Sequence, residues 1–129
     1  MRIAIVVVDV ANVMGSRPDG WWRDRAGAAL RLGREVIALA TAESSRDWVL
    51  VLEGRARDAV PQLAAETAGA PVRVASAPAS GDDMIVQTAA EAVARNEGCL
   101  VVTADRELRQ RCEELGASVV GPGWLLGRL

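Results

Sequence analysis

The chain has 129 residues, half of them hydrophobic, and a formal net charge of −2. These values fit one globular domain over residues 1–129, and they exclude a disordered chain and a strongly basic nucleic-acid-binding surface. No apolar run approaches the roughly 20 residues of a membrane-spanning helix. The chain has no histidine, which excludes catalytic triads and zinc sites that depend on this residue.

The chain begins with an apolar run that ends in an acid. Residues 3–8 are all apolar, which is typical of a strand buried on both faces of a parallel sheet, and Asp9 follows directly. One arginine before this short run does not make a signal peptide, so we expect a cytoplasmic protein. Residues 10–15 show no helical pattern. We therefore predict a loop there and expect that helix capping does not account for Asp9.

Strand and helix patterns alternate through the next part of the chain. Pro18 and Gly20 predict a turn before the first helix, and the second strand ends in another acid, Glu53. The predicted elements up to residue 76 are a helix over about 23–40, a strand over 47–53, a short helix over 59–67 and a strand over 72–76.

The second half of the chain continues this alternation. Ser80 followed by Asp83 resembles a capping box, which predicts the start of a helix. The remaining predicted elements are a strand over 99–103, a helix that Asp105 caps and Gly116 ends, a strand at 119–120 and a short tail at 124–126. The alternation predicts an α/β three-layer sandwich around a mostly parallel five-stranded sheet.

Acidic residues gather at one edge of this predicted sheet. Asp9, Glu53 and Asp105 each follow a parallel strand, so they share the edge where open α/β sheets bind ligands. Asp82 precedes the apolar stripe of its helix by helical spacing, which turns it inward, whereas Asp83 is offset toward solvent. We therefore prefer Asp82 as a ligand and keep Asp83 as the alternative.

Neighbouring carboxylates repel one another, and they stay ionised together only when a cation binds them. Oxygen ligands alone suit Mg²⁺ or Mn²⁺. Without histidine, hydrolysis would depend on the metal ion and the carboxylates to activate water. Asn12 carries a neutral amide that could orient a phosphate or a water molecule, and Glu53 and Glu107 could support the site.

Each of these acids also has a structural explanation. An aspartate before a helix, such as Asp105, is an ordinary N-cap, and acids in a first helical turn stabilise the helix dipole. Glu53 could pair with Arg55 or Arg57, and Glu107 is a normal first-turn residue. Only their gathering at one edge favours a metal site.

Two tryptophans and several arginines lie between the first strand and the first helix. Trp21 and Trp22 are adjacent, and Arg17 precedes them by a few residues. Aromatic rings beside arginines can stack on bases and contact phosphates. Arg17 and Trp22 are therefore candidates for RNA contacts, as is Arg106 beside the acids. The alternative is that one tryptophan closes the core, the other is partly exposed and the arginines are solvated.

Three segments of the chain resemble motifs of one family. Residues 7–13 (Val-Val-Asp-Val-Ala-Asn-Val) resemble the Asp-x-x-Asn opening of NYN domains, in particular the YacP-like branch of the PIN-like nuclease superfamily. Residues 80–86 are similar to the family's central acid at the start of a helix, and residues 101–108 to its Thr/Ser-x-Asp strand end. In order and spacing, the resemblance covers about residues 3–120.

The resemblance implies a sheet order of 3-2-1-4-5 and a metal-dependent ribonuclease, an endonuclease rather than an exonuclease, that acts on RNA with Mg²⁺ or Mn²⁺. Asp9, Asp82 and Asp105 match the family's acidic positions, and Asn12 matches its signature asparagine. Glu107 stands where the family often has a second aspartate. A homodimer or a protein partner is left open.

Two other functions compete with this interpretation. A non-catalytic RNA- or protein-binding module would keep the fold without cleaving RNA. A phosphatase of the haloacid dehalogenase type also uses an aspartate after the first strand, but it needs a second one where this chain has Ala11, and a lysine, which the chain lacks. A toxin of the PIN type is a biological variant of the ribonuclease interpretation.

Overall fold

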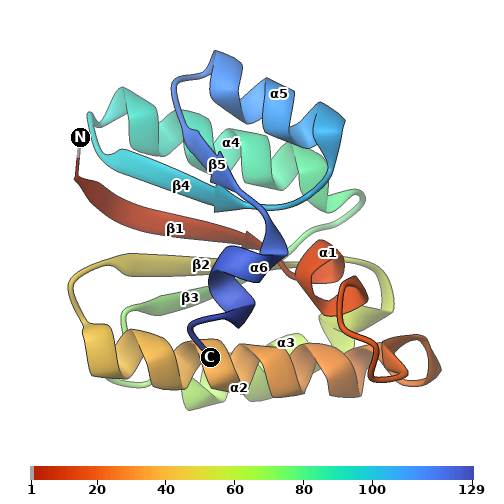
Figure 1. The fold of residues 1–129 in the computed structure, drawn as a ribbon. Coiled ribbons are helices and arrows are strands. Elements are labelled where there is room, and N and C mark those ends of the chain that lie inside the picture. Colours follow the sequence, from red (N-terminus) through yellow and green to blue (C-terminus); the bar gives the residue numbers. More distant parts are fainter. Residues whose placement is uncertain (1) are drawn as a thin grey trace.

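The computed structural model describes residues 2–129 as a five-stranded sheet with helices on both faces (Figure 1). The strand order is β3-β2-β1-β4-β5, and every neighbouring pair is parallel. The strands are β1 (Ile3–Asp9), β2 (Asp47–Leu52), β3 (Val72–Ser76), β4 (Gly98–Val102) and β5 (Ser118–Val120). The structure confirms the predicted fold class and the order that the resemblance implied.

The helices divide between the two faces of the sheet (Figure 1). One face carries α1 (Val10–Gly15), α2 (Arg25–Glu43), α3 (Val60–Glu66), α6 (Pro122–Leu126) and the 3₁₀ helix η2 (Gly54–Ala59). The other face carries α4 (Gly81–Ala94) and α5 (Arg106–Glu114), and a second 3₁₀ helix, η1 (Trp21–Arg23), precedes α2. No helix within residues 2–129 is long and apolar enough to cross a membrane.

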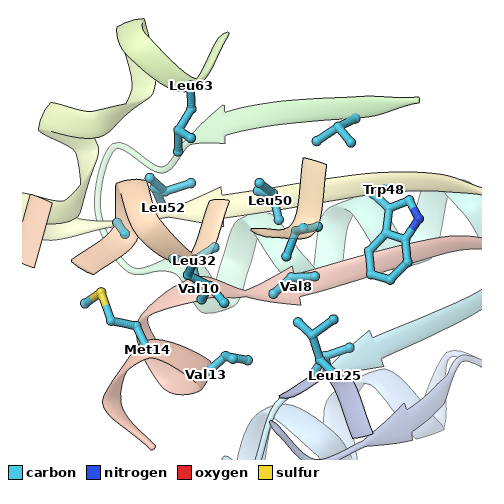
Figure 2. Packing of buried hydrophobic residues seen from close by; sticks show 14 of the residues in the cluster. Val8, Val10, Val13, Met14, Leu32, Trp48, Leu50, Leu52, Leu63 and Leu125 are labelled. Atoms are coloured by element: carbon cyan, nitrogen blue, oxygen red, sulfur yellow. The ribbon is translucent and has the colours of Figure 1, made fainter. Parts of the chain in front are cut away.

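The apolar runs of the central strands β1, β2 and β4 explain this three-layer arrangement. Successive side chains of a strand point to opposite faces, so Val6 and Val8 pack under α1 and α2, whereas Ile5 and Val7 pack under α4 and α5. Figure 2 shows the first of these cores, where Leu50 of β2 lies among side chains from several elements. Burying each such side chain stabilises the fold by roughly 1.5–3 kcal/mol.

The boundaries predicted from the sequence need two corrections. Residues 10–15 form the helix α1, not a loop, because six residues are too few to display a helical period. Ser80 does cap the start of α4, because its hydroxyl accepts a hydrogen bond from the backbone N–H of Asp82, but the Asp83 side chain pairs with Arg111 and so does not complete a capping box.

The packing of the first core predicts that two leucine-to-alanine substitutions have very different effects on the free energy of unfolding. Leu50→Ala should lower the free energy of unfolding by about 2–5 kcal/mol, because Leu50 is fully buried and a cavity would remain. The matched control Leu129→Ala removes the same atoms from an exposed position and should change it by less than about 0.5 kcal/mol. Urea denaturation measures both, and equal losses would contradict this packing.

Candidate functional site

Four acids from different parts of the chain lie at the carboxyl edge of the sheet. Asp9 ends β1, Glu53 follows β2, Asp82 lies in the first turn of α4, and Asp105 follows β4. Their charges act on one another. Burial raises the pKa of Asp82, and the nearby charges of Asp105 and Glu53 raise it further. These mutual repulsions place the four carboxylates in one electrostatic cluster.

Asp9 is the buried member of the cluster, with only 5% of its surface exposed. Its Oδ1 accepts a hydrogen bond from the backbone N–H of Asn12 at 3.4 Å, so Asp9 does cap a helix, contrary to the expectation from the sequence. Its Oδ2 accepts a second bond from the Thr103 hydroxyl at 2.9 Å. Burial nevertheless raises its pKa to about 6, and the charges of Asp82 and Glu53 add to this effect.

Thr103 also belongs to the site, although it was not among the candidate residues named from the sequence. Its hydroxyl is fully buried; it donates to Asp9 and accepts from the backbone N–H of Asp105 at 3.2 Å. One side chain thus joins two acids that come from neighbouring strands. The signal was present in the sequence, because Thr103 stands at a strand end two residues before Asp105.

Asn12 connects α1 to the loop after β4. Its side-chain oxygen accepts a hydrogen bond of 2.8 Å from the backbone N–H of Ala104, between Thr103 and Asp105. The oxygen is therefore occupied within the protein. This contact holds the Asp105 loop beside Asp9, so Asn12 has a structural role in the cluster whether or not its NH₂ group also contacts a substrate.

Glu53 contacts α4 and not the arginines that could have paired with it. Its Oε2 accepts a hydrogen bond from the backbone N–H of Gly81 at 3.1 Å, and a Cβ on Gly81 would lie 3.2 Å from Oε1. Arg57 instead donates to the carbonyl oxygens of Gly54 and Ala77. The close approach at Gly81 joins the end of β2 to the helix that carries Asp82.

Of the other candidate acids, Asp83 and Glu107 lie outside the cluster, and Asp105 is its exposed member. Asp83 pairs with Arg111 of α5 at 3.1 Å, and 85% of its side chain is exposed. Asp105 is exposed and caps α5 through a 2.9 Å bond from the N–H of Leu108 to its Oδ1. Glu107 is exposed in the first turn of α5. The cluster therefore consists of Asp9, Glu53, Asp82 and Asp105.

The chemistry of this donor set fits a hard divalent cation. All available donors are oxygens, which Mg²⁺ and Mn²⁺ prefer, and Mg²⁺ commonly uses only one or two carboxylates and keeps several waters. Within residues 2–129, no group of three acidic or cysteine side chains is arranged to hold a metal ion. The four acids thus form a negatively charged cluster that is not assembled into a metal-binding site.

The three candidates for RNA contacts have different surroundings. Both terminal nitrogens of Arg17 bond to the Glu35 carboxylate, at 2.8 and 2.9 Å, so this arginine is already engaged on α2. Trp22 is 55% exposed. Arg106 is exposed at the start of α5, next to Asp105. Of the three, Trp22 and Arg106 have side chains that are accessible from solvent.

Comparison with known proteins supports the fold. No protein-family model matches the chain. No curated protein matches it either. Among solved structures, the crystal structure of Rae1 (YacP) from Bacillus subtilis, in a mutant form, is similar with a TM-score of 0.74 and 16% sequence identity, over 97% of this chain and 74% of that one. At this identity the likeness shows a shared α/β fold alone, and the resemblance to NYN domains is supported only by that similarity of fold.

Asp9→Asn should stabilise the metal-free protein increasingly as the pH rises. The pKa of Asp9 lies at about 6 in the folded protein, against an ordinary value of 3.8. The folded state therefore binds the proton more tightly, and stability falls as the pH rises between these values. The variant should avoid this loss, which amounts to about 3 kcal/mol.

Urea denaturation in EDTA at about pH 4 and about pH 8 measures this gain. The exposed Asp83→Asn variant removes the same charge at the surface and should change stability little at either pH. A stability difference between Asp9→Asn and the parent that is equal at both pH values would contradict the burial of an ionised Asp9.

Thr103→Val should destabilise the protein by about 1–3 kcal/mol, because it leaves Asp9 and the N–H of Asp105 without a buried partner. It should also raise the pKa of Asp9, since the lost hydrogen bond lowers it. Urea denaturation and a carboxyl NMR titration measure the two effects. Thr103→Ser keeps the hydroxyl and should restore the pKa; a valine variant with an unchanged Asp9 titration would show that the contact is unimportant.

Proposed function

We propose that this protein is a metal-dependent ribonuclease that hydrolyses RNA phosphodiester bonds, as an endonuclease, with Mg²⁺ or Mn²⁺ as the cofactor. The observation that carries the proposal is the convergence of Asp9, Glu53, Asp82 and Asp105 at the ligand-binding edge of a PIN-like sheet. The repulsion among these groups has no structural benefit, and a bound cation would relieve it. The absence of any membrane-crossing helix within residues 2–129 is compatible with the cytoplasm as the place of action.

Asp9, Asp82 and Asp105 would bind the metal, with Glu53 beside them. Asp83 and Glu107 are less suitable, because Asp83 is paired with Arg111 and Glu107 lies on the exposed side of α5. When bound, the ion supplies Lewis-acid polarisation of the phosphodiester and lowers the pKa of water. The protein contributes rigid ligand positions, because Thr103 and Asn12 hold Asp9 and the Asp105 loop together.

The carboxylates have a second function in hydrolysis. With no histidine in the chain, the proton released by the attacking water must pass to a carboxylate or to solvent. Asp82 is half-buried, so its carboxylate borders both the cluster and the solvent that finally takes up this proton. Asp9 is more suited to holding the cation, since both its oxygens are fixed by hydrogen bonds.

Asp9→Asn and Asp82→Asn should each lower Mn²⁺-dependent cleavage of single-stranded RNA by at least about 100-fold, because each removes a charge that acts on the transition state. Gel analysis of an end-labelled oligonucleotide measures the rate, with an EDTA arm and a DNA oligonucleotide of the same sequence. The surface variant Asp83→Asn should cleave at close to the parent rate. Parent-like cleavage by Asp9→Asn would refute the proposal.

Metal binding can be measured independently of cleavage. Mn²⁺ should raise the melting temperature of the parent, because a ligand that binds only the folded state stabilises it. It should not raise that of Asp9→Asn. A parent that binds RNA but neither cleaves it nor responds to Mn²⁺ would instead be a non-catalytic RNA-binding module.

A further inference from the structure

A groove leads away from the carboxylate cluster along the surface formed by α1, η1, the start of α2 and η2. Its inner part, of about 290 Å³, lies between Trp21, Met14 and Glu53. Its outer part, of about 650 Å³, lies beside Trp22 and Asp58. The two parts are neighbours that share the lining residues Arg25, Gly54 and Arg55, and the inner part is lined by Glu53, one of the four clustered acids.

The outer part of the groove has an exposed aromatic wall. Trp22 is 55% exposed and is the one aromatic side chain so exposed among the described residues. Trp21 supports it edge-on, with ring centroids 5.9 Å apart at 89°, and Trp21 itself packs partly against the hydrophobic core. An exposed indole ring offers a flat surface on which a base can stack. The ring is therefore both accessible and held in place.

The groove also carries cations that have no acidic partner. Arg23 lies 5.6 Å from the centre of the Trp22 ring, Arg25 lies 5.3 Å from that of Trp21, and Arg55 is exposed on η2. Within residues 2–129, none of these three forms a salt bridge. Arginines nearby on α2 do: Arg31 pairs with Asp19 and Arg34 with Glu66.

In the described part of the chain, the acids that line the groove form no ion pair with these arginines. The Asp24 carboxylate caps α2 by accepting a hydrogen bond from the N–H of Gly27 at 2.9 Å, Glu53 at the inner end accepts one from the N–H of Gly81, and Asp58 lies at the outer end. Three arginines therefore face three acids, two of which are engaged with the backbone. This leaves an exposed tryptophan beside guanidinium groups that form no salt bridge with any described residue, which suits bases and phosphates.

We propose that this groove binds a single strand of RNA and directs it to the carboxylates. A base stacks on Trp22, and Arg25 and Arg55 contact successive phosphates where the two parts of the groove meet. A single strand fits because its bases are free to stack, whereas those of a duplex are paired. This inference rests on the proposed function for the identity of the strand, but it concerns binding and not cleavage.

Fluorescence anisotropy of a labelled single-stranded RNA oligonucleotide in EDTA tests the groove without catalysis. Trp22→Ala should raise the Kd by about 5- to 150-fold, and Trp22→Phe should restore most of the affinity because it keeps an aromatic face. Because Trp22 is exposed, the melting temperature should not fall. An unchanged Kd for Trp22→Ala would overturn the inference.

The salt dependence of the same Kd tests the arginines. Arg25→Ala and Arg55→Ala should each lower the slope of log Kd against log salt by about 0.7. Arg73→Ala is the matched control: it removes the same charge at the opposite edge of the sheet and should leave the slope unchanged. A slope that falls for Arg73→Ala or Arg106→Ala, and not for the groove variants, would place the RNA elsewhere.

The two proposals fail in different ways. Weakened RNA binding by Trp22→Ala together with parent-like cleavage by Asp9→Asn would support the RNA-binding groove and refute the proposed ribonuclease activity at the carboxylates. Loss of cleavage in Asp9→Asn together with unchanged binding in Trp22→Ala would refute the groove and keep the ribonuclease. Failure of the single-stranded RNA to bind the parent protein in EDTA would also refute the proposal that the groove binds RNA.

Discussion

The hydrogen bond between the Thr103 hydroxyl and Asp9 is the contact on which the edge of the sheet depends. Parallel pairing of β1 with β4, in which Val8 lies beside Val102, brings these two residues together. The same hydroxyl then bonds to the backbone of Asp105, which caps α5. One buried oxygen thus determines where two acids lie and where a helix begins. Asn12 makes a second connection between the same two segments, because its side-chain oxygen accepts a hydrogen bond from the backbone N–H of Ala104.

The fold is largely predictable from the sequence because the central strands β1, β2 and β4 contain long apolar runs and the longer helices show their period. The site is less predictable. Asp9 precedes a helix of only six residues, so its capping role had no visible signal. The contact of Glu53 with Gly81 joins residues 28 positions apart, and no local pattern encodes it. Thr103 was visible as a motif, but its hydrogen bonds depend on strand register.

The burial of Asp9 lowers the stability of the fold at the same position where it supplies a charge to the candidate site. A carboxylate that is largely withdrawn from water, and that lies near other acids, weakens the fold when it is ionised. A well-packed core on both faces of the sheet compensates for that weakening, since the strand that carries Asp9 is buried from Ile5 onward. Proteins retain unfavourable interactions of this kind mainly at functional sites, and a buried negative charge suits the binding of a positively charged ligand.

The spacing of the cluster along the chain also has a consequence for synthesis. The bond between Asp9 and Thr103 spans 94 positions, and Asp105 follows two residues later. Contacts between such distant segments form late in folding, because a long loop must first close. A nascent chain that still lacks β4 on the ribosome has no assembled cluster. The cluster therefore assembles only after β4 and the residues that follow it, up to Asp105, have been synthesised.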